Sequence, residues 1–235
     1  MLERDIVPGS KYVIIQNNKF FKYGVDGIIL SRFEDIKKGR SVLEIGSGTG
    51  IIPLRLASFY SPKIIYTVEI QKELCELFSK TIELNNLEDI IKLENIDINE
   101  YHPKEKLDYI ITNPPYRELD RGIYKKDQAF NTAFFEGSLK LEDIFVFSEK
   151  YLKEKGILIM INSINRLVDV MELGRKHRLE PFKLRFIHSE RGKNAYAFMA
   201  SLRRLSGKNL VTLPALYLYE NGKITDEVKE IYYGI

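Results

Sequence analysis

SVLEIGSGTGIIPL, residues 41–54, combines an apolar strand, a glycine-rich turn and the beginning of a helical pattern. Gly46, Gly48 and Gly50 lack Cβ atoms, so a ligand can lie against the backbone N–H groups at the start of the following helix. Their spacing is G-x-G-x-G, whereas dinucleotide-binding loops carry G-x-G-x-x-G, which disfavours a dehydrogenase. Glu44 precedes the turn, where a carboxylate suits a cationic ligand better than a diphosphate. Taken alone, the loop also fits a purely structural turn.

Two further apolar runs end in acidic residues downstream of this loop. The first ends at Glu69, 19 residues after Gly50, and a carboxylate there can accept hydrogen bonds from both hydroxyls of a ribose. The stretch NIDI, residues 95–98, places Asp97 at another strand end, where it can accept from an adenine amino group. Each acid taken singly also fits a solvated surface residue. Together with the glycine loop, the two acids predict a nucleoside site.

The tetrapeptide Asn113-Pro114-Pro115-Tyr116 follows a short apolar run, as a loop at a strand end does. The Asn113 side-chain carbonyl and the Pro114 backbone carbonyl can each accept one N–H of an exocyclic amine, which leaves the nitrogen lone pair directed at an electrophile. Tyr116 can stack on the ring that carries this amine. An isolated match of four residues fits a plain proline turn better. Its place downstream of the glycine loop reverses that preference and predicts an amine-modifying enzyme.

In this order, the motifs resemble those of class I S-adenosylmethionine-dependent methyltransferases of the N-P-P-Y type, which methylate amines. Residues 21–30, FKYGVDGIIL, are similar to a cofactor-covering motif of that family, within an N-terminal segment of about residues 1–35. Residues 213–233 resemble the tail of the bacterial tRNA N6-adenine methyltransferases that modify adenosine 37, beside the anticodon of valine tRNA. The resemblance covers nearly the whole chain and implies S-adenosylmethionine as cofactor. It implies cofactor binding by Asp26, Glu44, Gly46, Gly48, Gly50, Glu69 and Asp97, and catalysis by Asn113, Pro114 and Tyr116.

One stretch departs from the family pattern. Members often carry Ala-Arg-His-Glu after the N-P-P-Y loop, where this chain reads AFFE, residues 133–136. If the missing positive charge holds RNA, then nearby basic residues compensate or the substrate differs. A different substrate would be another planar amine, such as guanine N2, DNA adenine or a protein glutamine. Alternatively, the stretch belongs to a lid whose sequence varies without effect on the substrate. A non-catalytic RNA-binding module is disfavoured by the intact Asn113 to Tyr116 set.

Length and composition predict a single domain over residues 1–235, because 235 residues that are 44% hydrophobic can bury a sizeable core. Apolar strands alternate with helical stretches at 141–155 and 166–177. This alternation predicts an α/β fold, a mostly parallel twisted sheet with helices on both faces, as in Rossmann-like class I methyltransferases. The runs 182–189 and 195–203 read as a hairpin, which predicts a terminal antiparallel strand.

Several other features narrow the class of protein. The single cysteine, Cys75, cannot form an internal disulfide. No apolar run approaches the roughly 20 residues that span a bilayer, and the N-terminus, MLERD, lacks a signal segment, so we expect a cytoplasmic enzyme. A monomer is a separate expectation. The three histidines are scattered without cysteine partners at metal-ligand spacing, so no metal is expected. They are His102, His177 and His188.

The net charge of +3 conceals an uneven distribution. The run from Arg175 to Lys208 contains ten Lys or Arg and only two Asp or Glu, a local net charge of +8. Such a surface attracts phosphates whatever the base sequence and makes binding salt-dependent. A solvated face is the alternative. We predict that this run binds tRNA, with Arg117 to Lys126 as a second candidate contact.

Overall fold

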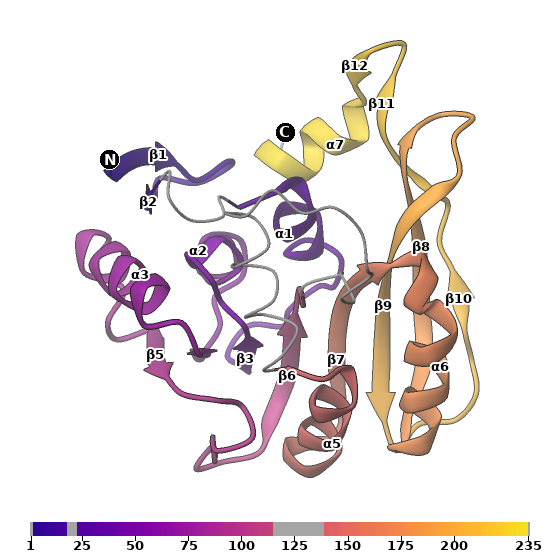
Figure 1. Cartoon of the computed structure of the whole chain (residues 1–235), viewed down its shortest axis with the longest axis horizontal. Helices are drawn as coiled ribbons and strands as arrows, with labels where there is room; N and C mark the ends of the chain where they lie inside the picture. Colours follow the sequence, from indigo (N-terminus) through magenta and orange to yellow (C-terminus); the bar gives the residue numbers. More distant parts are fainter. Residues whose placement is uncertain (1, 18–22, 115–138, 235) are drawn as a thin grey trace, which may run out of the picture.

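The structure, a computed structural model, describes residues 2–17, 23–114 and 139–234 (Figure 1). Strands and helices alternate along the first half of the core: β3 (Ser41–Ile45), α2 (Ile51–Phe59), β4 (Ile64–Glu69), α3 (Lys72–Leu84), β5 (Ile91–Asn95) and β6 (Leu107–Thr112). The second half contains α5 (Leu141–Tyr151), β7 (Leu152–Ser163), η1 (Ile164–Arg166), α6 (Leu167–Lys176), β8 (Leu179–Glu190), β9 (Ala195–Arg204), β10 (Val211–Thr212), β11 (Leu216–Glu220), β12 (Lys223–Ile224) and α7 (Asp226–Tyr233).

The main sheet has the strand order β12-β11-β8-β9-β7-β6-β3-β4-β5, with β10 also paired to β8. Strands β3 to β7 pair in parallel, which confirms the expected α/β, Rossmann-like architecture. The expected hairpin forms from β8 and β9. However, its antiparallel strand β9 is not at the end of the sheet but lies between β7 and β8. Strand β8 is therefore parallel to β7 and accepts β11 as a further parallel neighbour.

Two hydrophobic clusters cover the two faces of the sheet. Strand β7 shows the alternation: Ile157, Ile159 and Ile161 pack on the face covered by α1 (Val25–Leu30), α2 and α7, and Leu158 and Met160 on the face covered by α5 and α6. All five side chains are buried. The period of two residues along a strand produces this division. The sheet is therefore the middle of three layers, with helices packed on each of its two faces.

The N-terminal residues form a separate two-stranded hairpin, β1 (Leu2–Ile6) and β2 (Val13–Asn17). The Asn85 side chain at the end of α3 holds β2, because its Oδ1 accepts from the Val13 N–H (2.9 Å) and its Nδ2 donates to the Val13 carbonyl (2.7 Å). One turn earlier on α3, Thr81 Oγ1 accepts from the Ile15 N–H. Strand β2 thus runs antiparallel to α3, toward the carboxyl ends of the parallel strands.

The helix expected at 141–155 ends early, at Tyr151. Leu152 already has an extended backbone, with φ −68° and ψ 145°, and begins β7. Lys155 then has a positive φ of 60° and precedes Gly156, so the charged KEK sequence forms an irregular strand start instead of a last helical turn. In the described part of the chain, no helix is both long and apolar enough to cross a membrane.

Candidate active site

The carboxyl ends of the parallel strands bring the predicted residues to one edge of the sheet. Ile45, the last residue of β3, lies beside both Val68 of β4 and Thr112 of β6. Thr112 Oγ1 donates to the Ile45 carbonyl at 3.0 Å. The glycine loop after β3 and Asn113 after β6 are therefore neighbours, although 67 residues separate Thr112 from Ile45. We call this side of the sheet the carboxyl edge.

The glycine loop has the backbone that its sequence predicts. Gly46, Gly48 and Gly50 have φ values of 73°, 54° and 90°, which non-glycine residues rarely adopt. A Cβ on Gly46 or Gly48 would meet no described atom within 4 Å, so the described residues leave the space beside the loop open. At Gly50 a Cβ would lie 2.1 Å from the Phe78 ring of α3. The first two glycines therefore leave room for a ligand, whereas Gly50 permits helix packing.

Two acidic side chains flank the loop. Glu69 Oε2 accepts from the Gly48 N–H at 2.8 Å and its Oε1 from the Gln71 N–H at 2.9 Å, so this carboxylate joins the end of β4 to the loop. Glu44 and Glu69 are each only 2% exposed. Glu44 Oε2 is buried and has no hydrogen-bond partner among the described residues. The loop therefore lies between a buried acceptor without a donor and a carboxylate that fixes the loop backbone.

Burial and mutual repulsion change the acidity of this pair. Burial raises the pKa of Glu44 well above its usual range, and the nearby Glu69 charge raises the Glu44 pKa further. Burial also raises the pKa of Glu69, while the N–H groups of Gln71 and Gly48 oppose that rise. A cation beside the pair would lower both pKa values. The electrostatics of the loop thus favour a positively charged ligand group.

The other predicted residues at strand ends lie on the same edge. Pro114 is buried and Asn113 half-buried, directly after β6. Asp97 is half-buried, two residues after β5, and its Oδ1 accepts from the Asn99 N–H at 2.8 Å. Strand β5 is tied to β4 by Asn95, whose Nδ2 donates to the Glu69 carbonyl at 2.8 Å. The order β6-β3-β4-β5 therefore runs from Asn113 and Pro114, past the glycine loop, to both acids.

Asp26 reaches this edge from the N-terminal segment. It lies in the first turn of α1, and the Tyr196 hydroxyl donates to its Oδ1 at 3.0 Å. Tyr196 belongs to β9, one residue before Ala197, which pairs with Ser163 at the carboxyl end of β7. Burial raises the pKa of Tyr196, and the Asp26 charge raises it further. Asp26 is therefore fixed by a tyrosine that is distant in sequence and that the sequence patterns did not identify.

Two more polar groups were missed by the sequence analysis. Ser47 Oγ and Gln71 Nε2 are buried without a hydrogen-bond partner among the described residues. Ser47 lies inside the glycine loop, and Gln71 follows Glu69 by two residues. With Glu44 Oε2, they are three buried side-chain atoms around the loop that have no hydrogen-bond partner in the described part of the chain. Their closeness in sequence to a predicted residue, the glycines for Ser47 and Glu69 for Gln71, was the only signal available.

Some predicted residues lie outside the described part: Pro115, Tyr116, the basic stretch 117–126 and the divergent stretch 133–136. No three His, Cys, Asp or Glu side chains of the described ranges cluster as metal ligands. Cys75 is buried and its thiol contacts the Glu69 carbonyl at 3.3 Å. Burial raises the pKa of Cys75 to about 12, which keeps the thiol protonated at neutral pH.

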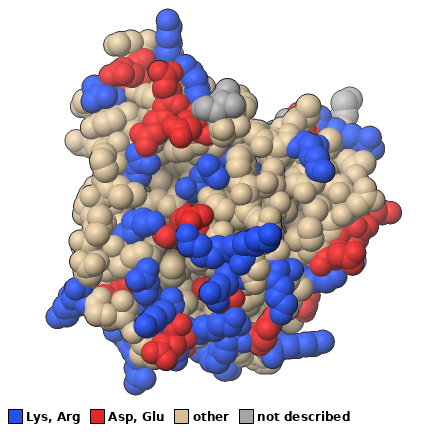
Figure 2. Space-filling model, turned by 180° about the vertical axis from the view of Figure 1, so that it is seen from behind, with Lys and Arg blue, Asp and Glu red and all other residues tan. Residues whose placement is uncertain are grey.

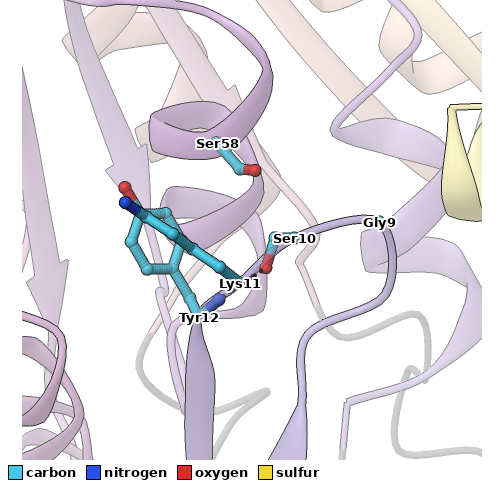
Figure 3. A pocket seen from close by; sticks show the side chains of 5 residues that line it. All are labelled: Gly9, Ser10, Lys11, Tyr12 and Ser58. Carbon is cyan, nitrogen blue, oxygen red and sulfur yellow. Dashed lines mark hydrogen bonds between the residues drawn. The ribbon is translucent and has the colours of Figure 1, made fainter.

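An open surface pocket lies elsewhere, between the β1–β2 turn and α2, lined by Gly9, Ser10, Lys11, Tyr12 and Ser58 (Figure 3). Lys11 and Tyr12 lie side by side, with the ammonium 5.9 Å from the ring centre. Ser58 is one residue from the end of α2, whereas the glycine loop precedes its first residue. The pocket is therefore separate from the strand-end residues. None of its five lining residues is a carboxylate, a cysteine or a histidine.

The basic run 175–208 does not form one continuous surface. Strand β8 is 12 residues long, or roughly 40 Å, and it separates the members of the run. Arg191 and Lys193 lie in the β8–β9 turn at the carboxyl edge. Most members are paired with acids, several from distant segments: Arg175–Glu180, Lys176–Glu142, Arg178–Glu149, Lys183–Glu34, Arg185–Glu227, Arg191–Glu220 and Lys193–Glu190. The local charge of the sequence is therefore largely compensated in the fold.

Comparison with solved structures supports the same architecture. A predicted O-methyltransferase from Agrobacterium tumefaciens, protein Atu636, superposes with a TM-score of 0.70 at 17% identity, over 89% of this chain and 96% of that one. Trm5 from Methanocaldococcus jannaschii, solved in complex with adenosine, gives a TM-score of 0.63 at 17% identity, over 88% of this chain and 56% of that one. At these identities the likeness shows the fold alone.

Proteins that are similar in sequence carry names that state a specific reaction. A tRNA1(Val) (adenine(37)-N6)-methyltransferase of Dyadobacter fermentans is 28% identical over 93% of this chain and 90% of its own length. The protein of the same name from Parabacteroides distasonis is 26% identical over 73% of this chain and 72% of its own length. The family model of the methyltransferase small domain matches residues 16–173, which include the glycine loop, both acids and Asn113. The chain belongs to the methyltransferase small domain family, and it is a methyltransferase.

Proposed function

We propose that this enzyme transfers a methyl group from S-adenosylmethionine to the exocyclic N6 of adenine in tRNA, at adenosine 37 of valine tRNA, in the cytoplasm. The observation that carries the proposal is the Thr112–Ile45 contact, which puts Asn113 next to the glycine loop. The names of the relatives from Dyadobacter and Parabacteroides support the acceptor. We propose one domain over residues 1–235, in which the N-terminal segment covers the cofactor.

The residues around the loop fit this cofactor. When bound, S-adenosylmethionine supplies a methyl group activated by its positively charged sulfur. Gly46 and Gly48 leave space for it among the described residues, and Glu44 Oε2 and Ser47 Oγ are buried polar atoms that have no partner in that part of the chain. Burial and the Glu69 charge destabilise the ionised form of Glu44, and a cation beside the pair relieves this, so Glu44 would accept from the α-amino group. A polar, cationic ligand would supply these buried atoms with hydrogen-bond partners that the described residues do not provide.

The acids beyond the loop would hold the nucleoside part. Each Glu69 oxygen accepts one backbone N–H, but an ionised carboxylate has about four lone-pair sites, so it can still accept from ribose hydroxyls. Asp97, on the neighbouring strand end, would accept from the adenine amino group. Asp26, fixed by Tyr196, would act from the covering segment. The three acids therefore approach the cofactor from three different segments of the chain.

Asn113 and Pro114 would position the methyl acceptor. The amide oxygen of Asn113 and the carbonyl of Pro114 accept the two N–H bonds of adenine N6, which favours the pyramidal geometry that frees its lone pair. Proximity and orientation then supply most of the rate enhancement, without a titrating general base. The target base must be turned out of its stack to reach this edge. Tyr116 would stack on it.

Replacing Glu69 tests the cofactor site. In Glu69→Ala we expect the dissociation constant for S-adenosylhomocysteine to rise about 10- to 100-fold, because hydrogen bonds to a charged group contribute about 1.5–3 kcal/mol. Titration calorimetry measures this change. Glu76→Ala, which removes an exposed acid from the same helix–strand unit, serves as the matched control. Unchanged affinity in Glu69→Ala, with a normal unfolding transition, would exclude Glu69 from the site.

The acceptor is tested by methyl transfer from tritiated S-adenosylmethionine to separate pools of total tRNA, ribosomal RNA, duplex DNA and release-factor protein. We expect label in tRNA, recovered as N6-methyladenosine after digestion to nucleosides. A valine tRNA transcript with guanosine in place of adenosine 37 should accept no methyl group. Label confined to ribosomal RNA, DNA or protein would instead assign the enzyme to another planar amine.

A further inference from the structure

Basic side chains gather at the opposite edge of the sheet, where the parallel strands begin. The back face of the molecule shows Lys and Arg concentrated over its lower part (Figure 2), which is the amino end of the parallel strands in Figure 1. Three segments that are distant in sequence contribute: 37–40 before β3, 155 at the start of β7 and 203–208 at the end of β9. Of their seven basic residues, Arg204 donates to the Glu149 carbonyl. We call the other six the amino-edge band: Lys37, Lys38, Arg40, Lys155, Arg203 and Lys208.

Strand register brings these segments together. Val42, Tyr109, Ile157 and Arg203 are consecutive neighbours across β3, β6, β7 and β9. At about 4.8 Å between strands, this row spans roughly 15 Å. Arg40 and Lys155 each precede a member of the row by two residues, and the Lys37 N–H donates to the Tyr109 hydroxyl at 3.4 Å. The band therefore crosses four neighbouring strands at one level of the sheet.

The band keeps more of its positive charge than the β8–β9 turn does. Lys38, Lys155 and Lys208 are exposed and form no ion pair or hydrogen bond with any described residue. Lys37 pairs with Asp35, and Arg40 with Asp108 at 3.1 Å. Arg203 lies 3.9 Å from the centre of the Phe182 ring. Three of the six charges thus face solvent without a partner.

The β8–β9 turn is different, although it carries the same kind of residues. Arg191 pairs with Glu220 at 2.5 Å, and Lys193 with Glu190 at 3.3 Å. Each positive charge there has a carboxylate within contact distance, so little net field remains to attract phosphates. The band, and not this turn, is the stronger candidate for contact with a polyanion.

We infer that the amino-edge band binds the sugar-phosphate backbone of the RNA substrate while the target adenine occupies the carboxyl edge. The inference rests on the proposed function. Tyr109 precedes Asn113 by four residues of an extended strand, or about 13 Å, so the band lies roughly 20 Å from the transfer site. Double-stranded RNA-binding domains contact about 16 base pairs of one RNA helix, which is longer than this distance. One RNA stem can therefore contact the band while its loop reaches the transfer site. Contacts of this kind add affinity and fix orientation without selecting the base.

The test compares two triple variants. Lys38→Gln, Lys155→Gln and Lys208→Gln remove the three unpaired charges of the band. Arg191→Gln, Lys193→Gln and Lys223→Gln remove the same charge from the two hairpins at the carboxyl edge. We expect the band variant to bind valine tRNA at least about tenfold more weakly and to flatten the slope of log affinity against log salt by roughly 2 to 2.7, since each phosphate contact contributes about 0.7–0.9. The hairpin variant should bind within about twofold of wild type.

Calorimetry with S-adenosylhomocysteine should give the same cofactor affinity for both variants, because neither touches the glycine loop. Wild-type affinity and salt slope in the band variant would overturn the inference. The inference would also be overturned if the band variant kept its tRNA binding but lost binding to anionic phospholipid vesicles. That result would assign the band to a membrane surface. The proposed function fails separately, if the wild-type enzyme methylates no tRNA at all.

Discussion

Asn113→Ala is expected to lower the rate of methyl transfer at saturating cofactor and tRNA by at least about 100-fold, since a misplacement of about 1 Å in a reacting group has an effect of this size. Asn113 follows β6 directly, and the Thr112 contact to β3 fixes the place of that strand end beside the glycine loop. The side chain would contact the acceptor amine and not the cofactor. The affinity for S-adenosylhomocysteine should therefore remain close to that of wild type.

Single-turnover methylation measures the rate of methyl transfer, and calorimetry on the same preparation measures the cofactor affinity. Asn194→Ala is a suitable control, because it removes an exposed amide from the β8–β9 turn at the same edge of the sheet. It should transfer methyl groups at the wild-type rate. Near-normal turnover in Asn113→Ala would rule out the amine-positioning account, whereas loss of both transfer and cofactor binding would indicate a disturbed loop.

Arg55→Met is expected to lower the free energy of unfolding by about 3 kcal/mol or more. Arg55 is fully buried in α2, and no carboxylate of the described residues accepts from it. Its guanidinium donates to the Ser31 hydroxyl at 2.8 Å and to three backbone carbonyls, two of them at the end of α7. The carbonyls are those of Pro8, Ile231 and Tyr232. Methionine fills similar space but leaves three buried acceptors unpaired, each at a cost of about 1–3 kcal/mol.

The cation is stable in this position for a physical reason. Burial lowers the pKa of Arg55 to about 10, so it stays charged at neutral pH. The negative end of the α7 dipole and the Phe59 ring, 4.9 Å from the guanidinium, replace the missing anion. Arg55 thereby joins the N-terminal hairpin, α1, α2 and α7.

Urea unfolding followed by circular dichroism measures the loss. Arg32→Met is the matched control: Arg32 also packs on Phe59, at 4.4 Å, but its side chain donates only a 3.4 Å bond to the Tyr60 hydroxyl. We expect Arg32→Met to cost less than about 1 kcal/mol. Equal losses in the two variants would mean that aromatic packing, and not the capping of carbonyls, gives Arg55 its effect.

Much of the site was predictable because it depends on strand ends. Parallel strands all place their carboxyl ends at one edge. Locating Ile45, Glu69, Asp97 and Thr112 at the ends of apolar runs was therefore enough to predict that the residues after them meet. The order β6-β3-β4-β5 then decided which of them are neighbours. The glycine loop was equally predictable from the sequence, because its three glycines stand where the backbone needs a positive φ.

Other features depended on contacts that no local pattern records. The +8 charge of 175–208 is a property of composition, but in the fold Arg185 of β8 pairs with Glu227 of α7, and Lys183 pairs with Glu34. Tyr196 fixes Asp26 across 170 residues of chain. Periodicity shows which face of an element is buried and where a strand ends, because both follow from backbone geometry. It does not identify the partner of a charged side chain, because that depends on strand order and register, which only the packed sheet decides.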